Sequence, residues 1–515
     1  MGGRMNKVFL CVALLFPAIA YVLVAVVGRP SYDTDYFEYI GWVISCGGEL
    51  YRDIWDCKGP LLYYLYALGQ FLFPSLCSGG TLLSLVLWEV VVLMIYRLSR
   101  SFGADKHAGA CALLFVVFAL GSGTWLWIGC QEIIAAFFAL VALQLIGVEN
   151  GGLDIRTDRS PVRIWGCVGL GACVAAAFMV KATCAAFGCA VFVFWCLQVF
   201  RSGNWRRALA QTGLSFAGFC AAFVGISYMC SGWSWERMLD ASILYNIFDR
   251  GHAGVSWGSF WFMRAKEFLY GDIMWFLRFG WNYPFFVSLF ALSFFLRTDG
   301  RVLFFRIWLA FELAVSVCSK GFFDHYLIVS AVPLTILFAQ AAFRVPLAYT
   351  FFKLAVIMFF LSSFGRFLFY YARFCHEEHG QWSAIAGVTC DIPEKTRVAV
   401  CGCTNIHVML RRWKLLNRNA YSAWMFWFFE SSKRRSEEML DDFERAVTSS
   451  ENEWILSEGL MDDLKSYCDD RHSRLRDELG KYQIYRVIEK PSVYFYKRIN
   501  AVRTQGRSEN GATGN

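Results

Sequence analysis

Long apolar runs recur along this chain from residue 8 to about residue 370, and most of them are about as long as a membrane-spanning helix. Such a helix needs about 20 mostly apolar residues, because each residue adds only about 1.5 Å to its length. Hydrophobic residues make up 57% of the 515 residues, charged residues make up 17%, and the mean hydropathy is +0.42. An average soluble domain is far more polar. The sequence therefore predicts a polytopic α-helical membrane protein.

One shorter apolar stretch, residues 60–76, decides which loops share a side of the membrane. If it is a full crossing, the basic loops near Arg100 and Arg206 lie opposite Arg4, against the positive-inside rule. If it lies along or dips into the outer leaflet, every strongly basic short loop is cytoplasmic, together with the N-terminus. We therefore predict about 11 spanning helices. They are residues 8–28, 80–97, 107–123, 129–147, 164–180, 183–200, 209–230, 274–296, 302–318, 325–343 and 347–369.

Three long segments then face the outside. Two are external loops, 29–79 and 231–273, of a membrane domain that covers residues 1–370. The third, residues 371–501, shows strand-like and helical patterns and is predicted to be a small extracytoplasmic α/β domain. Its expected strands are 397–400, 453–456, 482–488 and 493–499, and its expected helices are 434–447 and a segment near 459–479. Residues 502–515 have the polar, glycine-rich composition of a disordered tail.

Charged side chains gather in the outer loops and at the outer ends of the predicted helices. They include Asp33, Asp35, Asp53, Asp56, Lys58, Glu132, Lys181, Arg250 and His325. Each has an ordinary structural explanation. A lysine at a helix end often extends to the headgroups, a glutamate in an apolar helix often belongs to an ion pair, and acids after a helix often lie in a solvated loop. Their convergence on one face, which the helix count does not assume, favours a functional site.

Carboxylates and cations at a membrane surface suit a substrate that is part lipid and part polar. A carboxylate can act as a general base on an acceptor hydroxyl. Cations can stabilise the negative charge that develops on a phosphate leaving group. The apolar stretch 60–76 and the aromatic-rich segment 257–285 could shape a groove for an isoprenoid tail. Basic residues elsewhere are scattered over short loops, so nucleic acid is not an expected partner.

The first external loop carries a recognisable pattern. Asp33 follows the first helix, and Tyr51-Arg52-Asp53, Trp55 and Asp56-Cys57-Lys58-Gly59-Pro60-Leu61 come after it. This pattern resembles that of GT-C superfamily membrane glycosyltransferases, which include protein O-mannosyltransferase and aminoarabinose transferase relatives, and more closely their bacterial members. Further matches, in the expected order, are Gln131-Glu132, Lys181-Ala182-Thr183 and His325-Tyr326. The resemblance covers about residues 8–370.

The resemblance implies transfer of a sugar from a polyprenyl-phosphate donor to a hydroxyl acceptor on the outer face of the cell membrane, usually with inversion. The acceptor is a cell-envelope glycan, a lipid or a protein. By position the catalytic base is Asp33, with Asp35 as the second candidate, and the lipid phosphate leaves toward Lys181, Arg250 and His325. We expect Asp53, Asp56 and Lys58 to hold the loop and a substrate. Some relatives use a divalent metal, and the sequence leaves metal use open.

Two other functions are compatible with a polytopic chain. A transporter or a flippase for lipid-linked glycans usually places polar residues near the membrane midplane, often in repeated halves. In this sequence the polar residues lie at the outer helix ends and no repeat is evident. A non-catalytic surface protein would tolerate exchange of its carboxylates. The sequence also leaves open whether Cys46 and Cys57 form a disulfide.

Overall fold

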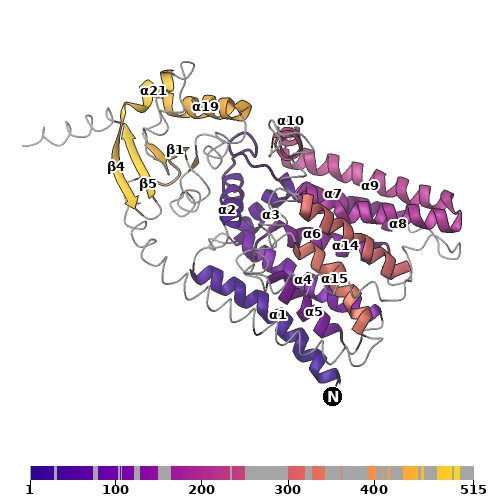
Figure 1. The fold of residues 1–515 in the computed structure, drawn as a ribbon. Coiled ribbons are helices and arrows are strands. Elements are labelled where there is room, and N and C mark those ends of the chain that lie inside the picture. The colour runs from indigo at the N-terminus through magenta and orange to yellow at the C-terminus, as the bar shows by residue number, and fades with distance from the viewer. Residues whose placement is uncertain are drawn as a thin grey trace, which may run out of the picture.

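Apolar helices form one part of the molecule, and a small sheet lies at one end of them (Figure 1). The computed structural model describes residues 2–27, 32–73, 79–102, 105, 107–120, 128–148, 164–231, 235–249, 300–318, 327–342, 361, 392–401, 410, 416–417, 433–449, 454–457, 473–489 and 492–498. The helices before residue 343 are α1 (Gly2–Val27), α2 (Tyr32–Ser45), α3 (Pro60–Leu72), α4 (Gly79–Ser101), α5 (Ala108–Leu120), α6 (Gln131–Leu145), α7 (Ile164–Val180), η3 (Ala182–Ala185), α8 (Ala186–Ser202), α9 (Trp205–Ser231), α10 (Trp235–Leu239), η4 (Asp240–Asp249), α14 (Gly300–Cys318) and α15 (Leu327–Ala342).

Every predicted span that falls within the described residues coincides with a helix. Residues 274–296 and, apart from Leu361, residues 347–369 lie outside them. Four helices in the described part are long and apolar enough to cross a membrane. They are Arg4–Val22, Gly79–Ser101, Ala182–Arg201 and Trp205–Cys230. Shorter apolar helices are Ala108–Leu120, Gln131–Leu145, Ile164–Val180 and Ile328–Gln340. The chain is therefore a helical, multi-pass membrane protein.

The course of α4 shows which turns share an end of the bundle. At the start of α1, the Asn6 side chain donates to the Asp105 carbonyl at 3.0 Å and accepts from the Gly109 amide at 2.5 Å. The turn from α4 to α5 therefore lies beside the N-terminus. The start of α4 instead contacts α2, at the other end. The chain thus enters α2 and leaves α3 at one end of the bundle, as expected if residues 60–76 add no crossing.

The segment 29–79, which was predicted to be an external loop, is more regular than expected. Its acids do not lie in a loop, because Asp33, Asp35 and Glu38 are all on helix α2. The Glu38 carboxylate accepts hydrogen bonds from the Thr81 amide at 2.6 Å and the Thr81 hydroxyl at 2.7 Å, and it also accepts from Gln70. A carboxylate at a helix N-terminus satisfies free amides and complements the helix dipole. Glu38 therefore has a structural role, fastening α2 to α4.

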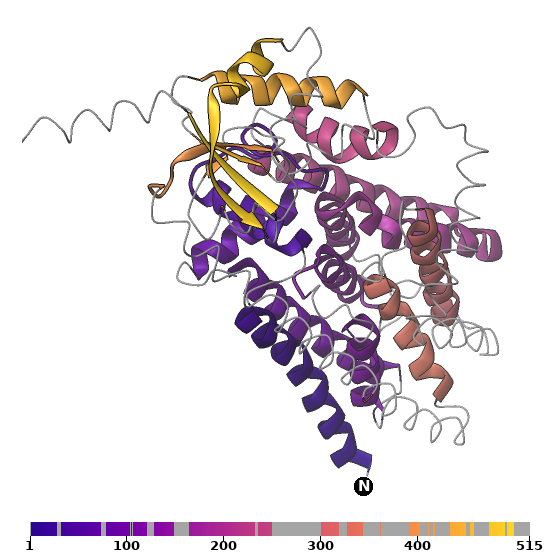
Figure 2. The same ribbon diagram turned by 60° about the vertical axis from the view of Figure 1, so that its left-hand side comes forward.

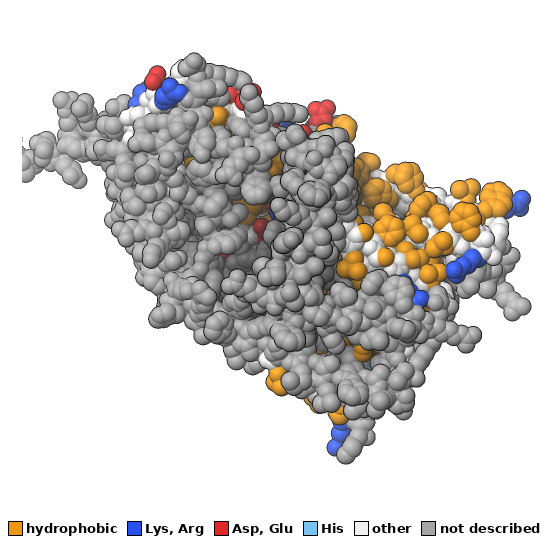
Figure 3. Space-filling view, viewed as in Figure 1, with side chains coloured by type: hydrophobic (Ala, Val, Ile, Leu, Met, Phe, Trp, Pro, Cys, Tyr) orange, Lys and Arg blue, Asp and Glu red, His pale blue; other side chains and the backbone are white. Residues whose placement is uncertain are grey.

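Close backbone packing joins α7 and α9. A Cβ atom on Gly171 would lie 1.8 Å from the Ser215 carbonyl oxygen, so only glycine allows this approach. Small residues commonly serve this purpose between helices in membranes. Helix α9 also exposes large apolar side chains, among them Leu209, Phe216 and Met229, and Figure 3 shows hydrophobic side chains gathered over this helix. Such a face suits contact with lipid.

The C-terminal region forms a mixed sheet whose described strands have the order β2-β1-β3-β5-β4. Its elements are β1 (Arg397–Cys401), β2 (Leu416–Asn417), α19 (Lys433–Thr448), β3 (Trp454–Ser457), α21 (Ser473–Leu479), β4 (Tyr482–Glu489) and β5 (Ser492–Arg498). Strand β1 pairs in parallel with β2 and β3, and β5 runs antiparallel to β3 and β4. The expected strands and the helix at 434–447 are thus present. The sheet lies beside α2, away from the N-terminus of α1 (Figure 2).

Candidate active site

A tight turn of residues 49–54 begins the candidate site. The Asp53 carboxylate accepts from the Glu49 amide at 2.8 Å and from the Arg52 guanidinium at 3.1 Å. Burial raises the pKa of Asp53, but these hydrogen bonds and the charge of Arg52 outweigh burial and lower the pKa below its ordinary value of 3.8. Asp53 was predicted to hold the loop and a substrate, and these contacts favour the first of the two roles.

The lowered pKa of Asp53 predicts how the stability of this turn depends on pH. Because the folded-state pKa lies below the unfolded-state value, ionised Asp53 stabilises the protein above pH 3.8. This contribution is lost as the pH falls through the folded-state pKa. We expect Asp53→Asn to have a lower Tm than the wild type at neutral pH, with the difference closing in acid. A difference that stayed constant over the whole pH range would contradict this assignment.

A buried carboxylate, Asp56, holds Lys58 in place. Asp56 is 0% exposed, and it accepts from the Cys57 amide at 2.6 Å and from the Tyr63 hydroxyl. Its Oδ2 atom lies 3.4 Å from Lys58 Nζ, which also lies 4.8 Å from the centre of the Phe37 ring. Buried charges of this kind are costly unless they are paired. Asp56 therefore holds the Lys58 ammonium beside Phe37 of α2.

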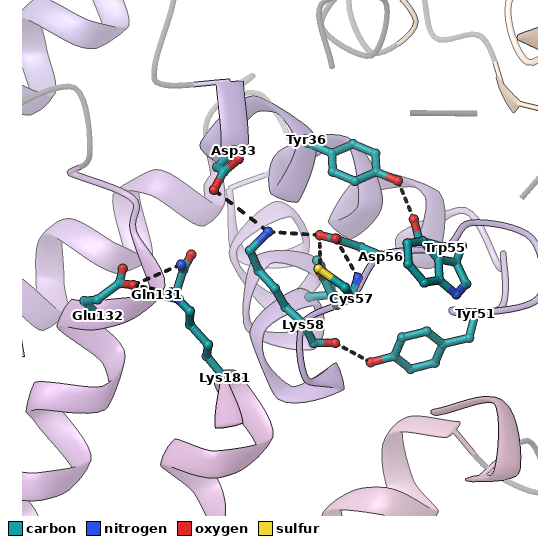
Figure 4. Close-up of polar contacts among 11 residues, drawn as sticks. Asp33, Tyr36, Tyr51, Trp55, Asp56, Cys57, Lys58, Gln131, Glu132 and Lys181 are labelled. Carbon is teal, nitrogen blue, oxygen red and sulfur yellow. Dashed lines mark hydrogen bonds and ion pairs between the residues drawn. The ribbon is translucent and has the colours of Figure 1, made fainter. Parts of the chain in front are cut away.

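Asp33 and Asp35 differ in what their side chains face. Lys58 Nζ lies 3.8 Å from Asp33 Oδ2, and the Asp33 side chain is 36% exposed (Figure 4). Asp35 is only 1% exposed. Residues two positions apart on a helix point in directions that differ by about 200°, because each residue turns the helix by about 100°. Asp33 therefore points to the open side with Lys58, and Asp35 points into the protein.

A second ion pair reaches this region from α6 and from Lys181, which lies between α7 and η3. Lys181 Nζ lies 2.9 Å from Glu132 Oε1, to which Gln131 Nε2 donates at 3.0 Å. Lys181 is buried, so it does not extend to the headgroups. Glu132 is the ion-pair member that its place in an apolar helix suggested. The Gly59 amide donates to the Val180 carbonyl at 3.1 Å, which brings the Lys58 loop against the end of α7, next to Lys181.

Gly59 allows this close approach because it has no side chain. A Cβ atom there would lie 2.0 Å from the Met179 carbonyl oxygen, a backbone atom that cannot rotate away. We expect Gly59→Ala to push the loop off α7. A shift of about 1 Å can lower a catalytic rate by about 10²-fold, and we expect a loss of rate of this size at the candidate site. The matched control is Gly213→Ala on α9, where a Cβ atom meets nothing within 4 Å. Equal activity of the two variants would contradict the expectation.

Aromatic side chains clamp the loop that carries Asp56 and Lys58. The Tyr36 hydroxyl donates to the Trp55 carbonyl at 2.6 Å, and the Tyr51 hydroxyl donates to the Lys58 carbonyl at 2.7 Å. The Trp55 ring meets the Tyr245 ring of η4 edge-on, with ring centres 5.1 Å apart. The loop is thus held from α2 and from η4. The sequence gives no signal for Tyr36 or Tyr245, because both act through contacts with Trp55.

The structure brings together five of the predicted site residues in two groups, Asp33, Asp56 and Lys58 in one and Glu132 and Lys181 in the other (Figure 4). The predicted residues Arg250, His325 and Tyr326 lie outside the described residues. Cys46 and Cys57, whose pairing the sequence leaves open, are not joined by a disulfide.

The described residues do not form a metal site. In this part of the chain no three His, Cys, Asp or Glu side chains could share a metal ion. The position between the Asp33 and Asp56 carboxylates is taken by the Lys58 ammonium. We therefore derive no step that uses a metal.

Similar proteins agree on the fold. No protein-family model matches the chain. Over 302 residues the chain is 25% identical to the undecaprenyl phosphate-alpha-4-amino-4-deoxy-L-arabinose arabinosyl transferase of Pseudomonas aeruginosa (strain LESB58). That match covers 54% of this chain and 48% of the relative, so the chain spans about half the length of this curated relative. The structure is similar to the crystal structure of ArnT from Cupriavidus metallidurans bound to undecaprenyl phosphate, with a TM-score of 0.59. The chain has the GT-C fold of ArnT.

The likeness to ArnT is one of fold, because only 15% of aligned residues are identical. It covers 94% of this chain and 97% of ArnT, so it extends well beyond residue 370, where the sequence resemblance ends. The oligosaccharyltransferase of Archaeoglobus fulgidus is also similar, with a TM-score of 0.51 at 13% identity over 94% of this chain and 73% of that protein. The fold implied by the resemblance that residues 33–61 carry is thus confirmed.

Proposed function

We propose that this protein is a membrane glycosyltransferase that moves a sugar from a polyprenyl-phosphate donor to a hydroxyl acceptor on the outer face of the membrane. The observation that carries the proposal is the partly exposed Asp33 carboxylate facing the Lys58 ammonium, which the buried Asp56 holds. The ArnT fold supports it. The name of the Pseudomonas relative describes a donor with a sugar on undecaprenyl phosphate, and ArnT has been crystallised with undecaprenyl phosphate.

In the proposed reaction Asp33 acts as the general base. Its carboxylate takes the proton of the acceptor hydroxyl as the acceptor oxygen forms a bond to the anomeric carbon. The bond from that carbon to the phosphate oxygen breaks at the same time, and polyprenyl phosphate leaves. Attack from the face opposite the phosphate inverts the anomeric carbon. Asp33 suits this role better than Asp35 because only Asp33 is exposed enough to reach a substrate.

Cations stabilise the departing phosphate. Lys58 and Lys181 are each held by one buried carboxylate, Asp56 and Glu132 respectively. Their ammonium groups are thus fixed before the substrate binds. Fixed charges stabilise a transition state without the cost of reorganisation. Arg250 and His325 remain proposed partners of the same phosphate, and Tyr326 and Asp53 remain proposed substrate contacts.

We further propose that the protein works in a bacterial cell membrane with its N-terminus in the cytoplasm and its C-terminal sheet outside. The basic turn after α4 lies beside the N-terminus, and the sheet lies at the other end. The acceptor is a hydroxyl of a cell-envelope glycan, a lipid or a protein.

Deleting the gene tests the function directly. We expect one polyprenyl-phosphate sugar to accumulate and one surface glycan, lipid or glycoprotein to lose a residue. Purified protein in lipid nanodiscs should transfer the accumulating sugar to the depleted acceptor. A protein that moved the lipid-linked sugar between leaflets but transferred none would instead be a flippase. An unchanged pool of lipid-linked sugars and an unchanged glycan profile would contradict the transferase.

A further inference from the structure

A single asparagine of the C-terminal sheet contacts the loop that carries the candidate site. Asn417 is on β2 and is 4% exposed. Its side-chain amide donates to the Asp53 carbonyl at 2.8 Å. Its carbonyl oxygen Oδ1 accepts from the Tyr39 hydroxyl at 2.9 Å, and its backbone amide donates to that hydroxyl at 2.9 Å. Three polar groups of Asn417 thus bind α2 and the loop.

These bonds are mutually compatible. A tyrosine hydroxyl donates one hydrogen bond and can accept another, so Tyr39 serves both groups of Asn417 at once. Burial raises the pKa of Tyr39 well above its usual range, which keeps the hydroxyl protonated and able to donate. Tyr39 is fully buried on α2, the helix that carries Asp33. Asn417 therefore ties α2 to the Asp53 backbone.

Asn417 is itself held by the sheet. Strand β2 pairs in parallel with β1, with Val398 opposite Asn417, and the Leu416 amide donates to the Thr396 carbonyl at 3.0 Å. The positive charge of Arg397 on β1 also lowers the pKa of Asp53. The sheet thus acts on the 49–54 turn through one set of hydrogen bonds and one charge.

We infer that Asn417 is a positioning residue through which the C-terminal sheet sets the distance between Asp33 and Lys58. Asp33 lies on the helix of Tyr39, and Lys58 lies five residues beyond Asp53. Asn417 thereby connects the helix that carries Asp33 with the loop that carries Lys58. The role in transfer rests on the proposed function, whereas the mechanical role does not.

Three variants and one control test the inference. Asn417→Ala removes both side-chain bonds. Asn417→Asp keeps the acceptor for Tyr39 but places a carboxylate oxygen against the Asp53 carbonyl. Tyr39→Phe removes the hydroxyl and leaves the bond to Asp53. The control, Thr396→Val, lies directly before β1 and loses the side-chain bond to the nearby Pro393 carbonyl.

Hydrogen exchange measures the mechanical role in the full-length protein in nanodiscs. We expect Asn417→Ala and Asn417→Asp to speed amide exchange over residues 49–58 by about tenfold, as the loop opens locally, with exchange in α4 to α9 unchanged. The Tyr39→Phe effect should be smaller, because it leaves the bond to Asp53. The effects of Tyr39→Phe and Asn417→Ala should add to less than their sum, because both remove the bond from the Tyr39 hydroxyl to Asn417 Oδ1. Unchanged exchange over 49–58 in Asn417→Ala, or an increase spread evenly over the protein, would overturn the inference.

Kinetics measure the consequence for transfer. A variant that merely unfolds in part loses kcat at constant KM, since fewer molecules are active. A displaced Lys58 should instead raise the KM for the lipid-linked sugar several-fold and also lower kcat. We expect this pattern in both Asn417 variants and wild-type constants in Thr396→Val. If the wild type transfers no sugar, the proposed function fails, and the exchange experiment still decides the role of Asn417.

Discussion

Replacing Asp33 with asparagine should lower kcat for sugar transfer by about 10²- to 10⁴-fold, the usual contribution of a general base. Asparagine has nearly the same shape but cannot accept the proton of the acceptor. The Asp33 side chain is 36% exposed and contacts Lys58 at 3.8 Å, so its loss should leave the fold intact. The measurement is transfer of the accumulating lipid-linked sugar, with the amount of folded protein checked by size-exclusion chromatography.

Asp35→Asn is the matched control, since it makes the same change two residues along the same helix. We expect a much smaller loss of transfer, because Asp35 is 1% exposed and points into the protein. Full transfer by Asp33→Asn, or a large loss only in a normally folded Asp35→Asn, would reverse the assignment of the base.

Replacing Lys58 with methionine should affect both stability and transfer. It leaves the buried Asp56 carboxylate without its ammonium partner, and breaking a buried pair in this way costs about 3–5 kcal/mol. It also removes a fixed positive charge beside Asp33. We expect a lower Tm in nanodiscs and a loss of transfer of about 10²-fold or more, the scale of losing one group that stabilises developing charge.

A second substitution separates the two effects of Lys58→Met. Adding Asp56→Asn removes the uncompensated charge but keeps an acceptor for the Cys57 amide. We expect the double variant to regain much of the lost Tm and none of the lost transfer. Recovery of transfer together with Tm would show that Lys58 serves only the fold.

The apolar helices were predictable because burial in lipid and protein needs only long apolar runs. Residues 164–180, for example, form α7 over that same range. The strand at 397–400 was predictable as a short buried run that ends in a turn, and the strand at 482–488 from its strand-like composition. Helix α2 was not predicted, because its acids suggest a solvated loop. The buried Glu38 carboxylate is bound by Thr81 and Gln70, which come later in the chain.

The site residues were found individually, but their partners were not. Glu132 and Lys181 were both candidates, yet they are 49 residues apart, and the sequence gives no sign that they pair. Asp33 and Asp35 could not be separated until the rotation of α2 was known. Asn417 carries no sequence signal at all, since an asparagine in a polar region is ordinary and its contact Tyr39 lies 378 residues away.

The contact between Asn417 and Asp53 also has a consequence for how the protein is made. The two residues are 364 positions apart, and synthesis at roughly 5–20 residues per second separates them by roughly 20–70 s. Glu38 can engage the start of α4 early, because only 43 residues separate it from Thr81. The loop with Lys58 must instead wait until Asn417 has been synthesised. During translation the helices can thus enter the membrane before the candidate site is complete.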